Sequence, residues 1–201
     1  MPEKAAPPTA PERREAIIRA ATELFANESF HGVGMRAIAD EVGIRSSSLY
    51  HHFPSKMDLL DAIATDATQQ FVETHLPMLE GDGSRADRLR RLLEEHILYY
   101  WEHRTEEYVG LRELRQLAPE RRERVNDIRL RYQHALEQCI RDGKKAGEFD
   151  PPDPHITTLA VLNMVNGVND WFHPGGKLSI KQVARAYADI AVDRIIGAQA
   201  P

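Results

Sequence analysis

The sequence predicts an all-α protein of about nine helices. Apolar residues recur at helical spacing along most of the chain, no segment shows convincing strand alternation, and glycine or proline clusters separate the periodic segments. With 201 residues, of which 42% are hydrophobic, the chain is long enough to bury a core. The expected architecture is a small domain of three helices followed by a larger helical bundle.

The first predicted helix follows a polar tail. Residues 1–11 contain alanine and proline but no apolar core of a signal sequence, so a disordered tail in a cytoplasmic protein is expected. From Pro11 onward, apolar side chains fall on one helix face; they are Ile17, Ala20, Ala21, Leu24 and Phe25. This helix opens a domain expected over residues 12–56, and its periodicity stops before residues 27–34.

Residues 35–53 contain two short helical segments joined by a glycine turn. Gly43 stands where a helix often ends in a left-handed residue. The hydroxyls of residues 46–48 can cap the second segment, and Pro54 ends it. This layout is typical of a helix-turn-helix unit, whose second helix enters the DNA major groove.

Candidate DNA-binding side chains lie in and around the second segment of this unit. The net charge of −5 disfavours indiscriminate binding to a polyanion, so any contact must be local. The only charged residues between Val42 and Met57 are basic, and Lys56 opens the next helix, where the helix dipole attracts anions. The predicted set is Arg36, Arg45, Ser46, Ser47, Ser48, Tyr50, His51, His52 and Lys56.

Each of these residues also has a simpler interpretation. His51 and His52 can be solvated polar residues, and Tyr50 can be a packing residue with a wet hydroxyl. A metal site at the two histidines is disfavoured, because neighbours on a helix point about 100° apart and no carboxylate or cysteine completes a ligand set. No metal or other cofactor is predicted.

The helix-turn-helix segment resembles the signature of the TetR family of transcriptional regulators over residues 13–60. The matching stretches are Ile38-Ala39, Val42-Gly43-Ile44, Ser48-Leu49-Tyr50-His51-His52-Phe53 and Ser55-Lys56. The resemblance implies a homodimer that binds operator DNA and is released by a small molecule. It also implies phosphate contacts for Tyr50 and Lys56, positions near bases or phosphates for Ser46, Ser47, His51 and Arg36, and core positions for Leu49 and Phe53.

The sequence departs from the family pattern at two places. Gly34 stands where a serine or threonine usually caps the helix, and Arg45-Ser46-Ser47 replaces a frequent Ser-Lys-Gly type of turn. These departures affect which bases the protein prefers and whether one phosphate contact of the family pattern forms.

Residues 57–201 are predicted to form a ligand-binding and dimerisation bundle. Helical patterns, the first opened by the capping pair Ser55 and Asp58, cover residues 55–76, 84–103, 106–117, 119–147, 155–171 and 179–196. The last two form an antiparallel hairpin, whose apolar faces are expected to pair with those of a second copy.

Aromatic residues and a polar set within an apolar helix suggest the effector pocket. The predicted ligand-binding residues are Phe71, Tyr100, Trp101, Tyr108, Arg112, Asn163, Asn166 and Trp171. Core packing is the alternative for each aromatic residue. Arginines are frequent from Arg85 to Arg131, which indicates a solvated face or contacts to an anionic ligand head.

The stretch Trp171-Phe172-His173-Pro174-Gly175-Gly176, with Leu178 and the following helix, resembles TetR regulators of fatty-acid or steroid breakdown in actinobacteria, several of which respond to acyl-CoA thioesters. An acyl-CoA is therefore one candidate effector, and an aromatic or cationic drug-like compound is another. A helical binding module that does not contact DNA also remains open.

An enzyme is disfavoured, because no nucleophile, phosphate-loop or metal-spaced motif assigns a catalytic group. No run of apolar residues is long enough to span a membrane, and Cys139, the only cysteine, cannot form an internal disulfide. Operator DNA, a small effector and a second copy of the chain are thus the predicted partners.

Overall fold

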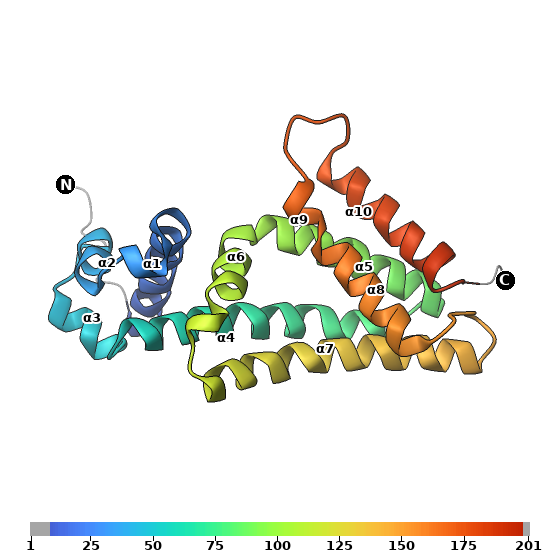
Figure 1. The fold of residues 1–201 in the computed structure, drawn as a ribbon, viewed down its shortest axis with the longest axis horizontal. Coiled ribbons are helices and arrows are strands. Elements are labelled where there is room, and N and C mark those ends of the chain that lie inside the picture. Colours follow the sequence, from blue (N-terminus) through green and yellow to red (C-terminus); the bar gives the residue numbers. More distant parts are fainter. Residues whose placement is uncertain (1–8, 199–201) are drawn as a thin grey trace, which may run out of the picture. The chain divides into compact units, whose positions relative to one another are not determined.

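The computed structural model describes residues 9–198, without the side chains of Leu111 and Arg112. Helices dominate this part of the chain and no strand occurs in it (Figure 1). One isolated bridge joins Phe149 and Ala198. The all-α prediction is confirmed. The α-helices are α1 (Ala10–Gly32), α2 (Met35–Val42), α3 (Ser46–His52), α4 (Lys56–His75), α5 (Arg85–Glu102), α6 (Arg104–Arg112), α7 (Pro119–Lys145), α8 (Pro154–Asn166), α9 (Val168–Trp171) and α10 (Ile180–Asp189).

Three short helical segments connect or extend these helices. The 3-10 turns η1 (Leu76–Leu79) and η2 (Leu114–Gln116) follow α4 and α6, and the π-helical turn η3 (Ile190–Ile195) continues α10. The chain divides into two compact units. Among the described residues, unit 1 contains residues 9–67 together with Thr105–Glu123, and unit 2 contains Thr68–Arg104 and residues 124–198.

This division differs from the predicted boundary at residue 56. The first part of α4 and the whole segment Thr105–Glu123 belong to the same unit as α1, α2 and α3. Within unit 1, Gly110 of α6 lies so close to α4 that a side chain there would meet the Cα of Ala64 at 3.6 Å. A glycine therefore lets α6 approach α4 closely.

Helix α1 begins earlier and ends later than its apolar pattern indicates. A capping box between Thr9 and Glu12 starts the helix at Ala10, so residues 10 and 11, expected in the tail, are helical. Residues 1–8 of that predicted tail lie outside the described part. Near its end, Ser29 departs from helical geometry with a φ of 67°, and a further turn including Phe30 follows.

Unit 2 is built around α5. Its face with Leu89, Leu92, Leu93 and Ile97 is buried, and α5 packs against α8 and α10 (Figure 1). Arg90 adds ion pairs to Asp189 and Asp193, at 2.9 and 2.6 Å. These contacts fix the carboxyl-terminal hairpin to the centre of the bundle.

The end of α7 makes one close contact in unit 2, between Gly143 and the ring of Phe149. Gly143 is buried on α7, and a Cβ there would lie 2.1 Å from the ring carbon Cδ2 of Phe149. Phe149 is itself buried in the core. Glycine at this position therefore makes room for the phenylalanine ring.

Candidate nucleic-acid interface

The helix-turn-helix has the geometry that its sequence predicts. Gly43 ends α2 in the left-handed region, with a φ of 72°, and its N–H bonds to the carbonyl oxygens of Ala39 and Asp40. The N–H of Ile44 also bonds to Ala39, at 2.9 Å. This Schellman-like end turns the chain sharply into α3.

The start of α3 differs from expectation. Arg45 occupies the N-cap position, and no side chain makes a capping bond there, although residues 46–48 were expected to supply hydroxyl caps. The carbonyl of Arg45 instead accepts from the N–H groups of Ser48 and Leu49. The serine hydroxyls thus remain available for other contacts.

Helix α3 presents one face to the core and the other outward. Leu49 and Phe53 are buried, as the family resemblance implies, whereas Tyr50 is 50% exposed and His51 is exposed. The predicted outward presentation of Tyr50 and His51 is confirmed, and their contact with DNA stays a prediction. Ser47 is exposed as well, whereas Ser46 and His52 are half-buried.

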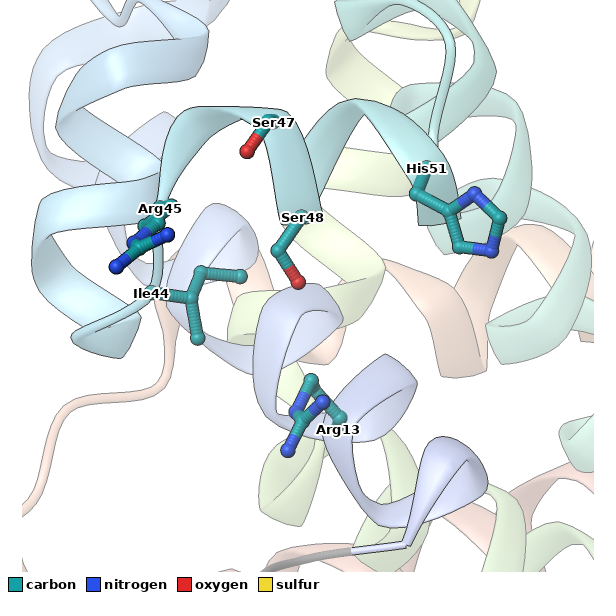
Figure 2. Close-up of a pocket in the computed structure, with 6 residues that line it drawn as sticks. All are labelled: Arg13, Ile44, Arg45, Ser47, Ser48 and His51. Atoms are coloured by element: carbon teal, nitrogen blue, oxygen red, sulfur yellow. The ribbon is translucent and has the colours of Figure 1, made fainter.

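A shallow depression of about 500 Å³ lies between α1 and α3. Figure 2 shows the six side chains that line it, which are Arg13, Ile44, Arg45, Ser47, Ser48 and His51. None of them is acidic, and they offer guanidinium, hydroxyl and imidazole groups, all of which can donate to phosphate oxygens. The depression brings together four of the predicted DNA-binding residues, Arg45, Ser47, Ser48 and His51.

Arg13 is the residue of this depression that sequence reasoning missed. It comes from the first turn of α1 and is half-buried, more than thirty positions from α3 along the chain. The adjacent arginines Arg13 and Arg14 at a helix start were the available signal. Arg14 serves another purpose, because it pairs with Asp66 at 2.8 Å and lies over the ring of Phe53.

The other predicted DNA-binding residues, which are Arg36, Ser46, Tyr50, His52 and Lys56, do not line the depression. Arg36 is exposed on α2, with Asp40 of the same helix 3.9 Å away. Such an exposed pair is weak and leaves the guanidinium accessible.

Lys56 has a different environment from the one expected. Its ammonium donates to the carbonyl oxygens of Phe30 and Val33, at 2.7 and 2.8 Å, and lies 4.4 Å from the centre of the Phe30 ring. Burial lowers the pKa of Lys56 below its ordinary value. Lys56 thus joins the start of α4 to the connection between α1 and α2, and two of its three N–H donors are already used.

The start of α4 is also tied to α7 within unit 1. Ser55 and Asp58 make the predicted capping pair, with the Asp58 N–H bonded to the Ser55 hydroxyl at 3.2 Å. Arg121 of α7 donates to Asp58 at 2.6 Å and lies 3.4 Å from Asp61. The Ser55 hydroxyl and then the Arg121 guanidinium hold the pKa of Asp58 below its ordinary value.

The predicted ligand-binding residues of unit 2 lie partly in an aromatic core cluster. Phe71 is buried, stacks on His75 and meets Tyr100 and Tyr132 edge-on or tilted. Phe71 and Tyr100 are therefore core residues in this structure. Their contact with an effector stays a prediction.

Asn166 belongs to a buried polar chain inside that cluster. Its carboxamide oxygen accepts from His96 Nε2 at 2.9 Å, so His96 Nδ1 is left to accept from the Tyr132 hydroxyl at 3.1 Å. Burial lowers the pKa of His96 to about 3, and burial also raises the pKa of Tyr132. The histidine is neutral at physiological pH, which both hydrogen bonds require.

The remaining predicted ligand-binding residues do not gather at one place. Trp101 meets Phe172 edge-on, and Trp171 stacks on Tyr187 at the surface. Asn163 is exposed and donates to a carbonyl of its own helix. Tyr108 belongs to unit 1 and is 45% exposed, and the side chain of Arg112 lies outside the described part.

The described residues offer no metal centre, since no three His, Cys, Asp or Glu side chains are placed to hold an ion there. Within residues 9–198, no helix is long and apolar enough to cross a membrane.

A helix-turn-helix with an outward-facing second helix, followed by a helical bundle, defines a DNA-binding transcription regulator. Residues 17–63 match the family described as bacterial regulatory proteins, tetR family, and residues 82–195 match the tetracyclin repressor-like C-terminal domain. The chain belongs to the TetR family of transcriptional regulators. The resemblance seen in the sequence is confirmed.

Several relatives are similar over most of their length. The transcriptional repressor KstR2 of Mycobacterium tuberculosis is 25% identical over 185 residues, which cover 91% of this chain and 92% of that protein. The TetR family regulator PfmR from Thermus thermophilus is 31% identical with a TM-score of 0.80, covering 88% and 96% of the two chains. AibR, solved with isovaleryl coenzyme A and operator DNA, is 28% identical with a TM-score of 0.81, covering 94% and 100%.

Proposed function

We propose that the chain is a ligand-responsive transcriptional repressor that binds a palindromic operator as a homodimer and is released by a small, mainly apolar effector. The observation that carries the proposal is the outward face of α3, with Tyr50 and His51 exposed beside a depression free of acidic side chains. Phosphate contacts from Arg13 and Arg45 orient the protein on DNA, and polar groups of α3 reach the base edges.

The dimer is proposed to form through the last two helices. Ile156 of α8 is 60% exposed and Ile190, the first residue of η3, is 46% exposed, although both are large aliphatic residues. Burial of such a face against a second copy removes apolar surface from water and gives a twofold assembly. Two recognition helices related by that axis address an inverted repeat with more affinity than one net-acidic protomer has.

The effector is proposed to be an acyl-CoA thioester or a similar amphiphile. The aromatic interior of unit 2 and the arginines on its helices suit a ligand with an apolar body and an anionic head. The complex of AibR with isovaleryl coenzyme A and operator DNA supports this choice. An aromatic or cationic effector is the alternative.

Coupling between the two functions is proposed to run through α4. This helix contributes Lys56 and Asp58 to unit 1 and Phe71 and His75 to unit 2. A ligand that lowers DNA affinity must itself bind more weakly to the DNA complex, because the coupling free energy is reciprocal.

A gel shift on the DNA that flanks the gene tests the proposal, with and without a panel of acyl-CoAs. We expect a salt-dependent shift for the full-length chain that Tyr50→Ala weakens. In the assay without effector, Tyr108→Ala is the control, because it removes a similarly exposed tyrosine that belongs to α6 of the same unit and is not a predicted DNA contact. Equal shifts for both variants contradict the assignment of α3.

A helical binding module without DNA contact is the second candidate. It predicts no salt-dependent shift on any flanking fragment, together with ligand binding by the bundle. If saturating long-chain and steroid acyl-CoAs leave an existing shift unchanged, the thioester part of the proposal is wrong.

A further inference from the structure

Unit 2 contains a cavity that none of the predicted ligand-binding residues lines. It has a volume of about 550 Å³ and lies among η1, the first turns of α5 and the carboxyl-terminal half of α7. Pockets of roughly 300–1,000 Å³ commonly hold small molecules. Leu76, Leu79 and Ala135 supply apolar walls, and Leu76 and Leu79 also pack against the core of the unit.

Arg88 places a fixed guanidinium in the wall of this cavity. Its Nη1 donates to the carbonyl oxygens of Gly81 and Gly83, at 3.1 and 2.8 Å. Its Nε is buried and has no acceptor among the described residues. Backbone carbonyls fix the group in place but do not neutralise its charge, and a partly buried cation without a counter-charge is costly.

The other charged residues of the cavity wall have partners or lie in water. Arg85 pairs with Glu148. Asp142 accepts from Gln138 at 2.9 Å and lies 3.7 Å from the ammonium of Lys145. Glu80 is exposed, so water solvates its carboxylate. Arg88 is therefore the lining charge that a bound anion stabilises most.

We propose that this cavity binds an amphiphile that has one anionic head, a carboxylate or a phosphate, and a short apolar body. The head pairs with Arg88, because the guanidinium fork matches the oxygens of both groups. The apolar body lies along Leu76, Leu79 and Ala135, beside the thiol of Cys139. This inference deepens the proposed function and rests on it, since the occupant is then the effector or the anionic end of the effector.

Cys139 provides a reporter for this site. It is the only cysteine in the sequence, it lines the cavity and it is half-buried. The full-length chain is alkylated with N-ethylmaleimide in the presence of octanoate, octyl phosphate or octylamine, and isothermal titration calorimetry gives each Kd. We expect octanoate or octyl phosphate to slow alkylation about tenfold at ten times its Kd, because occupancy then leaves about one site in ten free.

The three probes have the same number of carbon atoms and differ in the charge and chemistry of the head group. Octylamine has the same chain with the opposite charge and is expected not to protect Cys139. A difference between octanoate and octyl phosphate identifies the preferred head. Calorimetric binding of either anion without protection of Cys139 places the ligand elsewhere and overturns the proposal, as does the absence of binding by both anions.

A matched pair of variants tests the role of Arg88. Arg88→Gln is expected to weaken binding of the anionic probe by about tenfold or more, the loss of one hydrogen bond to a charged group. Arg91→Gln is the control, since Arg91 is on the same helix, donates to the carbonyl of Asp82 and does not line the cavity. Equal affinities for the two variants contradict the assignment, and if Arg88→Gln does not fold, the protection of Cys139 in the unchanged chain still decides.

These measurements contain no DNA, so their failure is separate from failure of the proposed function. If the operator shift is absent while Cys139 is protected, the proposed repressor function is wrong and the anion site is supported. If the operator DNA is shifted while Cys139 is not protected, the proposed anion site is wrong and the repressor function is supported.

Discussion

Replacement of Lys56 by methionine tests whether its ammonium is structural or contacts DNA. Methionine keeps an unbranched side chain and removes the charge. The carbonyl oxygens of Phe30 and Val33 then lose the donor that now lies at 2.7 and 2.8 Å. The connection between α1 and α2 loses its link to the start of α4.

The expected loss of stability follows from these two bonds. A hydrogen bond to a charged group contributes about 1.5–3 kcal/mol, and the lower end applies here because Lys56 is only half-buried and water can replace it. We therefore expect the free energy of unfolding to fall by about 3 kcal/mol, the sum of two such bonds at the lower end of that range. Urea denaturation followed by circular dichroism measures this loss.

The salt dependence of DNA binding separates the two roles of Lys56. Each phosphate contact adds about −0.9 to the slope of log Kobs against log salt concentration. We expect Lys56→Met to lower the affinity through disorder of the helix-turn-helix and to leave this slope unchanged. Arg45→Met is the contrasting variant, because Arg45 is exposed beside α3 and its loss reduces the slope without a loss of stability.

The opposite pattern refutes this reasoning. If Lys56→Met keeps the free energy of unfolding and reduces the salt slope by about 0.9, the ammonium leaves the carbonyl oxygens and binds a phosphate, as the family resemblance implies.

Three further predictions concern a DNA contact, a packing contact and a buried titratable group. Arg13→Ala is expected to reduce the salt slope of operator binding by about 0.9. Arg19 is exposed further along α1, and Arg19→Ala is expected to leave the slope unchanged. Equal slopes for the two variants contradict a phosphate contact at Arg13. Gly143→Ala is expected to lower the free energy of unfolding by about 1–3 kcal/mol, since the added Cβ overlaps the Phe149 ring. In a Phe149→Ala background the same substitution is expected to be stabilising, because alanine favours a helix. The same loss of stability in both backgrounds excludes this contact as the cause. Burial lowers the pKa of His96 from 6.5 to about 3. Between these two pH values the unfolded chain takes up a proton on this histidine and the folded chain does not. The contribution of neutral His96 to stability is therefore present above pH 6.5 and falls by about 1.4 kcal/mol per pH unit below it. Denaturation at several pH values is expected to show a shallower dependence for His96→Gln, and an unchanged slope refutes the assignment.

Local sequence patterns predicted the elements that depend on local chemistry. Gly43 adopts the left-handed conformation that ends α2, and Leu49 and Phe53 are buried, as the family resemblance implies. Ser55 and Asp58 form the expected capping pair. In each case, residues within one or two helical turns determine the outcome.

Contacts between distant residues were not predictable from these patterns. The position of Arg13 beside α3 depends on how α1 packs, and the environment of Lys56 depends on carbonyl groups more than twenty residues earlier. Backbone carbonyls leave no trace in a side-chain pattern, so the sequence does not indicate the bonds of Lys56 to Phe30 and Val33, and its phosphate contact stays a prediction. The buried chain of His96, Tyr132 and Asn166 likewise joins three helices and has no local signature.

The composition of unit 1 has a consequence for how the protein is made and how it can be divided. During translation α1 to α4 leave the ribosome before Thr105–Glu123, the segment that completes their unit. Contacts such as Gly110 against Ala64 and Arg121 with Asp58 join distant parts of the chain, so they can form only after that segment has left the ribosome. A chimera that takes only residues up to Ala67 lacks α6, which packs on α4 through Gly110. A working transplant of the DNA-binding unit must therefore extend through Glu123.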